Sequence, residues 1–167
     1  NGVIINPPNI PFKNFDMKSY IEKKFSIKAE VENDAKCVAL SESVFGAGKG
    51  KKNFFVLTLG TGIGGGVVID GELYNARDIG TELGNIYLDN GKRFEELAGG
   101  KGKFEITKRK IGKEMNVSEL MEMNNKIAKE ILDDISGYLA MGIGSLINIF
   151  NPEIVVLAGG MREAGEE

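Results

Sequence analysis

The sequence has no histidine and a single cysteine, Cys37, among its 167 residues. These absences exclude zinc sites built from His and Cys ligands, and they exclude histidine as a general acid or base. One cysteine cannot form a disulfide within the chain, which is the usage expected in a reducing compartment. We therefore expect a cytoplasmic location and no zinc.

A long apolar run and a strong charge excess are also absent. No stretch reaches the roughly 18 consecutive apolar residues of a membrane span, and the opening NGVIINPPNIPF lacks the form of a signal peptide. The net charge of −3 provides no broad basic field for nucleic acid or an anionic membrane. We expect a soluble globular segment that binds neither partner.

What the sequence does contain is an alternation of helix and strand signals. Asp16 precedes apolar residues at helical spacing, which predicts a capped helix with one buried face, and the run IKAEV (27–31) predicts a strand. A helix is predicted after it, up to Gly46. Residues 54–60, 64–70 and 72–75 then predict three consecutive antiparallel strands, the last two joined by a hairpin turn at Asp70-Gly71.

The second half of the chain continues in the same manner. NIYLD (85–89) predicts a fourth strand, FEELA (94–98) a short helix, and residues 118–150 one long helix that Asn151-Pro152 ends. IVVLAGG (154–160) predicts a buried strand whose terminal glycines stand where α/β sheets place ligands. These elements indicate an α/β fold with a mixed sheet and flanking helices.

The run GTGIGGG (60–66) has the letters of a dinucleotide-binding fingerprint, but a strand follows it where that fingerprint requires a helix. A P-loop is excluded because no Gly-Lys-Ser/Thr closes the run. Two interpretations stay open. The backbone amides of a glycine-lined hairpin could bind phosphate oxygens, or the run could be a bulged hairpin whose glycines supply positive φ and bind nothing.

Three carboxylates are candidates for chemistry. Asp34 lies between a predicted strand and a helix, where it is either a helix cap or a general base that accepts a proton from a sugar hydroxyl. Glu82 and Glu95 could accept further sugar hydroxyls. Their alternatives are a solvated loop charge for Glu82 and a favourable helix-dipole position for Glu95.

The order of PPNIPF, ENDA with ALSE, LTLGTGIGGGVVIDGELY, TELG, FEELAGG and NPEIVVLAGGM resembles sugar kinases of the ROK family along nearly the whole chain. The resemblance implies an α/β fold of the ribonuclease H-like, actin-like ATPase type. It implies that residues 1–48 end a smaller N-terminal domain and that 49–167 form a larger, C-terminally truncated one. It also implies ATP with Mg²⁺, transfer of phosphate to a hexose hydroxyl, and a homo-oligomer.

The resemblance also assigns roles to individual positions. Asp34 matches the catalytic base, and no residue matches a metal ligand. The sugar-binding positions are Asn33, Glu82, Asn85 and Glu95. The phosphate-binding positions are Gly60, Thr61, Gly62, Gly64, Gly65 and Gly66, and the adenosine-side positions are Gly159 and Gly160.

The chain departs from the family pattern in three ways. Asn85 stands where the family has histidine, the cysteine-rich zinc loop is missing, and so is the N-terminal Asp-x-Gly-Gly-Thr phosphate motif. We therefore expect a zinc-free fragment that phosphorylates poorly or not at all by itself. Within the resemblance, the alternatives to a glucokinase-like enzyme are an N-acylhexosamine kinase, the sugar-sensing domain of a transcriptional repressor, and a non-binding relative used only for assembly.

Overall fold

The computed structural model describes residues 2–5, 11–75 and 81–160, and its chain forms two compact units, Asn1–Asp34 and Ala35–Glu167. The division expected from the sequence, between residues 48 and 49, stays a prediction. Within the described ranges, no helix is both long enough and apolar enough to cross a membrane.

The first unit contains a strand pair and one helix. Strand β1 (Val3–Ile4) pairs antiparallel with β2 (Phe15–Asp16), and helix α1 (Met17–Phe25) follows directly. The predicted cap is confirmed, because Oδ1 of Asp16 accepts a hydrogen bond of 3.0 Å from the backbone N–H of Ser19.

Two predictions for the first unit are wrong. No residue of α1 is buried, so its apolar residues do not form the expected buried face. Residues 27–31 are not a strand, because a strand requires a hydrogen-bonded neighbour and no described strand pairs with this segment.

The second unit is built on a four-stranded sheet with the order β5-β4-β3-β8. Strands β3 (Phe54–Leu59), β4 (Ile63–Ile69) and β5 (Glu72–Leu73) form the predicted antiparallel series, and β8 (Ile154–Ala158) pairs parallel with β3. The hairpin turn after β4 is also confirmed. Both of its residues have left-handed φ, 54° at Asp70 and 84° at Gly71.

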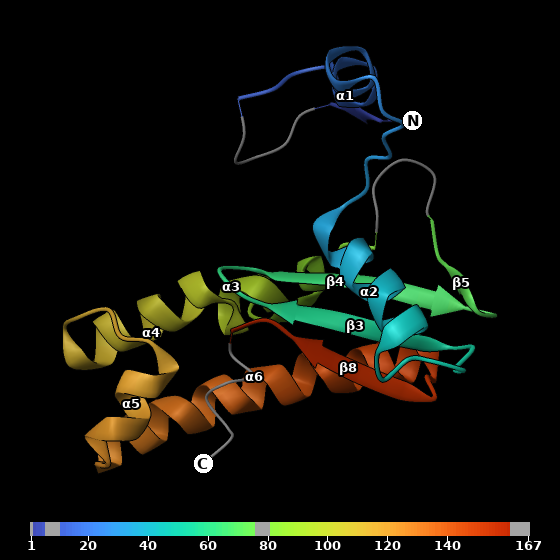
Figure 1. The fold of residues 1–167 in the computed structure, drawn as a ribbon. Helices are drawn as coiled ribbons and strands as arrows, with labels where there is room; N and C mark the ends of the chain where they lie inside the picture. Colours follow the sequence, from blue (N-terminus) through green and yellow to red (C-terminus); the bar gives the residue numbers. More distant parts are fainter. Residues whose placement is uncertain (1, 6–10, 76–80, 161–167) are drawn as a thin grey trace. The chain divides into compact units, whose positions relative to one another are not determined.

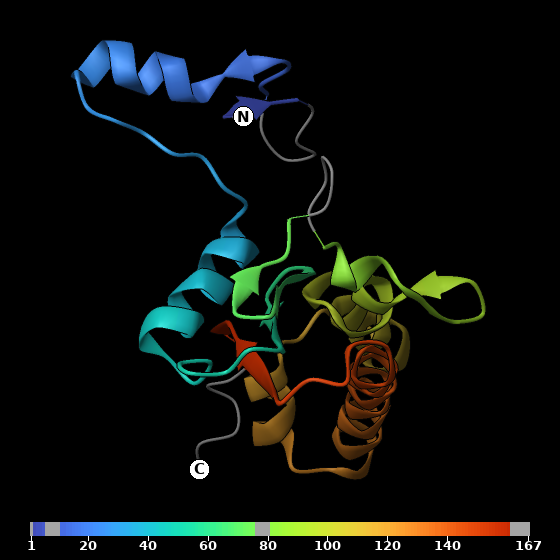
Figure 2. The same cartoon turned by 90° about the vertical axis from the view of Figure 1, so that its right-hand side faces the viewer.

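Alternate residues of β3 face opposite sides of this sheet. Helix α2 (Asp34–Phe45) covers one face, where Ala39 packs with Phe54 and Val56. Helices α3 (Phe94–Ala98) and α6 (Lys126–Phe150) cover the other, where Phe55 and Leu57 join the core. Figures 1 and 2 show the sheet between α2 and α6.

The long helix predicted for 118–150 is in fact two helices. Helix α5 (Val117–Met123) ends at Asn124, which has a left-handed φ of 40°, and Asn125 then caps α6 by accepting a hydrogen bond of 2.9 Å from the N–H of Ala128. At its other end α6 stops at Asn151, as predicted.

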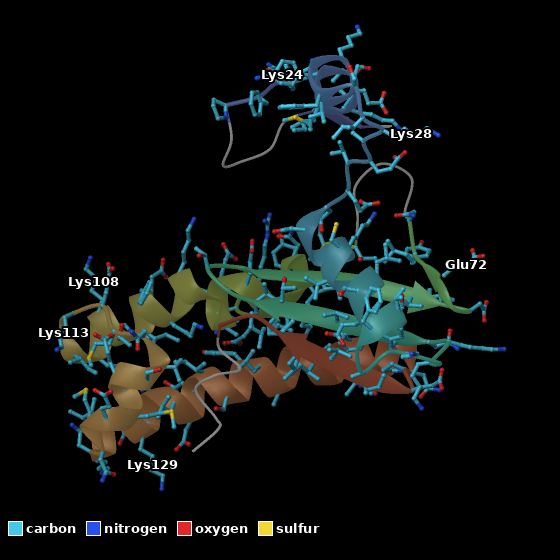
Figure 3. All side chains as sticks on the ribbon, in the orientation of Figure 1. Lys24, Lys28, Glu72, Lys108, Lys113 and Lys129 are labelled. Carbon is cyan, nitrogen blue, oxygen red and sulfur yellow. The ribbon has the colours of Figure 1, made fainter. Side chains whose placement is uncertain are left out.

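Helix α4 (Gly100–Ile111) was not predicted from the sequence. Together with α5 and the first half of α6 it encloses a second core, built around Ile106, Leu120 and Ile131. The side chains of Lys108, Lys113 and Lys129 project from this helical extension (Figure 3).

Two further strand predictions need correction. The predicted fourth strand, β6 (Tyr87–Asp89), does not join the main sheet, because it pairs with β7 (Lys92–Arg93) in a small hairpin of its own. Strand β8 has only Val156 buried. It lies at the edge of the described sheet and therefore has one neighbour, β3.

Candidate functional site

The turn between β3 and β4 consists of Gly60, Thr61 and Gly62, closed by a 3.0 Å hydrogen bond from the N–H of Gly60 to the carbonyl of Gly62. None of the five glycines in residues 60–66 has a positive φ. The interpretation that this hairpin needs glycine for left-handed backbone is therefore wrong. The presence of five glycines in this run must therefore have another physical cause.

The start of α4 anchors this turn. The N–H groups of Gly100 and Lys101 donate to the carbonyls of Gly60 and Thr61, at 3.0 and 3.2 Å. These bonds use two of the helix amides that lack a partner within the helix. In the part of the chain that the structure describes, no hydrogen bond is recorded from the N–H groups of Thr61 and Gly62. The anchored turn therefore presents two adjacent donors, the arrangement that binds anions in backbone concavities.

Gly64, Gly65 and Gly66 lie within β4 rather than in the turn. A Cβ at Gly64 would come within 2.6 Å of Oγ1 of Thr58, and one at Gly66 within 3.1 Å of the carbonyl oxygen of Ala35 in α2. On the opposite face, a Cβ at Gly65 would lie 2.5 Å from the side chain of Leu83. Close packing therefore requires these three glycines. Their assignment to phosphate binding stays a prediction.

A cavity of about 370 Å³ opens where β3 and β8 end. Its lining includes three residues predicted to bind nucleotide, namely Gly60, Thr61 and Gly160. The structure thus brings together parts of the chain separated by a hundred residues. Gly159 shapes this corner, because its φ is 101° and a Cβ there would meet the carbonyl oxygen of Leu59 at 2.5 Å.

Sequence reasoning missed the residues that close this cavity. They are Gly100, Lys103 and Phe104 of α4, together with Asn116, Val117 and Ser118 at the start of α5. Lys103 is only 6% exposed, and this burial lowers the pKa of its ammonium group. The available signal was the run GGKGK directly after FEELA, which combines small residues with a cation.

Glu95 reaches the turn from α3. Its Oε2 atom lies 2.9 Å from the position that a Cβ at Gly62 would occupy. Because Gly62 has no side chain, the half-buried carboxylate can lie directly against the turn. A predicted sugar ligand and a predicted phosphate-binding residue are therefore in contact.

Glu82 is the N-cap of a short 3-10 helix, η1 (Leu83–Asn85), and Asn85 is its last residue. This helix packs on the beginning of β4. A Cβ at Gly84 would collide with the carbonyl of Ile63, so this segment lies directly on the strand. Nδ2 of Asn85 donates to Oε2 of Glu82 at 3.3 Å. The two predicted sugar ligands are thus coupled to each other.

Asn33 and Asp34 end the first unit. Both are exposed, and Asp34 is the first residue of α2. The backbone N–H of Asn33 donates to Oε1 of Glu32 at 2.8 Å. The next residue, Ala35, is buried and packs against Gly64 of β4.

Comparison with known proteins identifies the family of this chain. The model of the ROK family matches residues 1–166. The chain belongs to the ROK family. It is 33% identical to a glucokinase from Thermotoga maritima over 99% of the chain and 61% of that protein, and 30% identical to the xylose repressor of Bacillus spizizenii over 98% of the chain and 46% of the repressor.

The solved structure of a ROK hexokinase from Thermus thermophilus superimposes with a TM-score of 0.81 at 28% identity, covering 91% of this chain and 59% of the hexokinase. The predicted fold class, an α/β fold of the ribonuclease H-like (actin-like ATPase) type, is confirmed. The chain spans about half to three fifths of the length of these ROK relatives.

Proposed function

We propose that the protein transfers the γ-phosphoryl group of ATP to a hydroxyl of a hexose, in the manner of a glucokinase. The observation that supports this most directly is the contact between Glu95 and the turn at Gly62. A sugar held by Glu95 would lie beside a phosphate held by the turn. Phosphoryl transfer needs this proximity above all, since its catalysis consists mainly of positioning and electrostatic stabilisation.

The nucleotide would occupy the cavity between β3, β8 and α4. A volume of about 370 Å³ suits part of a nucleotide. Its phosphates would accept hydrogen bonds from the N–H groups of Thr61 and Gly62. The buried Lys103 adds a cation to the same cavity, and a bound phosphate would raise the pKa that burial has lowered.

Mg²⁺ is expected to accompany ATP and to neutralise charge on its phosphates. Among the described residues, no three Asp, Glu, His or Cys side chains lie close enough to hold a metal. Mg²⁺ usually keeps several waters and is bound through one or two carboxylates together with substrate phosphates.

Asp34 is proposed as the general base, and Asn33, Glu82, Asn85 and Glu95 as the sugar ligands. An aspartate within hydrogen-bonding reach of the reacting hydroxyl accepts its proton as the new bond to phosphorus forms. The homo-oligomer and the cytoplasmic location remain predictions.

A sugar sensor in a transcriptional repressor is the second candidate, supported by the 30% identity to the xylose repressor. Asp34 favours the kinase, because binding a sugar does not require a general base. An N-acylhexosamine kinase differs from the first proposal only in its substrate.

The deciding experiment is an ATP-dependent phosphorylation assay of the full-length protein on glucose, mannose, N-acylated hexosamines and xylose. Turnover should fall by about 10²- to 10⁴-fold in Asp34→Asn, the usual contribution of a general base. Sugar affinity should change little, because an amide replaces the carboxylate without loss of size. Binding of a sugar without turnover of any of them would exclude the kinase and support the sensor.

A further inference from the structure

Arg93 connects the two segments that carry the proposed sugar carboxylates. It is the last residue of β7 and the N-cap of α3, so it stands two residues before Glu95. Its guanidinium Nη1 donates to Oδ1 of Asn85 at 3.1 Å. Asn85 in turn donates to Glu82. A chain of hydrogen bonds therefore runs from Arg93 through Asn85 to Glu82.

This chain fixes the orientation of the Asn85 amide. A guanidinium group can only donate and a carboxylate can only accept, so Oδ1 must face Arg93 and Nδ2 must face Glu82. An amide without such partners can turn over and present either atom to a neighbour. With Nδ2 directed at Glu82, one oxygen of that carboxylate is held in place and the other remains available to a ligand.

Arg93 is solvent-exposed, and both its backbone and its side chain make a further contact. Its backbone N–H donates to Oε2 of Glu96 at 2.7 Å, and its guanidinium lies over the ring of Tyr87, 5.8 Å from the ring centroid. An arginine side chain is charged at every pH of interest, and its interactions with Tyr87 and then with Glu96 raise the pKa of Arg93 further. The β6-β7 hairpin thus presents a permanent cation to Asn85.

We propose that Arg93 is a positioning residue for sugar binding, which orients the Asn85 amide and through it the carboxylate of Glu82. The proposal rests on the function proposed above, since it assigns a role in the same sugar site. Arg93 does not touch the reacting atoms in this scheme. Its effect is therefore expected in the binding of the sugar and not in the binding of ATP.

The test compares Arg93→Ala with Arg93→Lys and with Lys92→Ala, an exposed control in the same hairpin. Arg93→Ala should raise the KM for the sugar about tenfold, the effect of one lost charge-assisted hydrogen bond. The KM for ATP and the melting temperature should stay unchanged. Lys92→Ala should match the wild type, and Arg93→Lys should recover part of the sugar affinity.

A double-mutant cycle with Asn85→Ala separates positioning from a general structural role. If Arg93 acts through Asn85, Arg93→Ala adds no further loss once the amide is gone. Additive losses, or an equal rise in the KM for ATP, would overturn the proposal. If the wild type turns over no sugar, calorimetric titration with the same sugars replaces KM. A wild type that binds no sugar at all would refute the proposed function and this role together.

Discussion

At the residue scale, the glycines of the 60–66 run separate into groups that substitution can distinguish. A Cβ at Gly60 would enter open space, and the φ of Gly60 is not positive, so alanine fits there. Gly60→Ala should change the free energy of unfolding by less than about 0.5 kcal/mol. Because Gly60 lines the proposed nucleotide cavity, we expect the KM for ATP to rise roughly tenfold, as when one hydrogen bond to a charged phosphate is lost.

Gly66→Ala is the matched comparison, because its methyl group would meet the backbone of α2 at Ala35 and Lys36. Overpacking of this kind destabilises by about 1–3 kcal/mol. Thermal unfolding measures the stability of both variants. The KM for ATP is needed only for Gly60→Ala. A Gly60→Ala protein with unchanged stability and an unchanged KM for ATP would show that the turn does not bind phosphate.

The sequence alone could not separate these groups. It predicted the hairpin and the phosphate interpretation, since both depend on the spacing of glycines between two strands. It could not distinguish Gly60 from Gly66, because that difference depends on α2 packing against β4. Lys103 was missed for the same reason: its neighbours in the cavity, Thr61 and Gly160, are distant in the sequence.

At the element scale, Glu153 fixes the start of the parallel pair β3-β8. Its Oε1 accepts hydrogen bonds from the N–H groups of Lys52 and Asn53, at 2.7 and 3.0 Å, while its own N–H donates to the carbonyl of Asn53. The two backbone hydrogen bonds lower the pKa of this carboxyl group. A lowered pKa in the folded state stabilises the protein above the pKa of the unfolded chain, and this contribution disappears as the pH falls through the folded value.

Glu153→Ala should therefore lower the melting temperature at neutral pH. The difference from the wild type should persist down to about pH 4.3, the ordinary pKa of glutamate, and should disappear at lower pH. Melting curves from pH 7 to pH 2 measure it, with Glu72→Ala as an exposed control on β5. A difference that stays constant over this range would show that the charge of Glu153 has no role in the pairing.

The elements that the sequence predicted correctly are those with strong local signals. Strands β3 and β4, the Asp70-Gly71 turn, α3 and the end of α6 at Asn151 all follow from the residues within them.

The wrong predictions concern which segments pack or pair with one another. Residues 27–31 have strand-like composition without a described neighbour, and β6 pairs with β7 instead of the main sheet. Helix α4 was missed because its glycine-rich start, GKGK, has low helix propensity. Its anchoring to the turn after β3 compensates for this low propensity.

At the scale of the whole molecule, the position of the domain boundary can be tested. The sequence places it at residues 48 and 49, in the run GAGKGKKN, whereas the compact units divide at Asp34 and Ala35. The run GAGKGKKN (46–53) is folded. The backbone N–H groups of Lys49 and Lys51 donate to the carbonyls of Gly46 and Gly48 at 3.1 and 3.0 Å, and Gly48 packs beneath the ring of Phe54.

The segment before the division at Asp34 is different. Residues 28–33 have no regular structure, and Lys28 is exposed (Figure 3).

Limited proteolysis with trypsin should therefore cut first at Lys28 and leave the second unit intact, because proteases select exposed segments that lack regular secondary structure. The three hydrophobic clusters formed by the described residues lie entirely within this unit, so it retains its core after the cut. Mass spectrometry of the early fragments identifies the site. First cleavage at Lys49, Lys51 or Lys52 would favour the boundary predicted from the sequence. If a hexose protects Lys28, ligand binding involves the segment that leads into Asn33 and Asp34, as a general base at Asp34 requires.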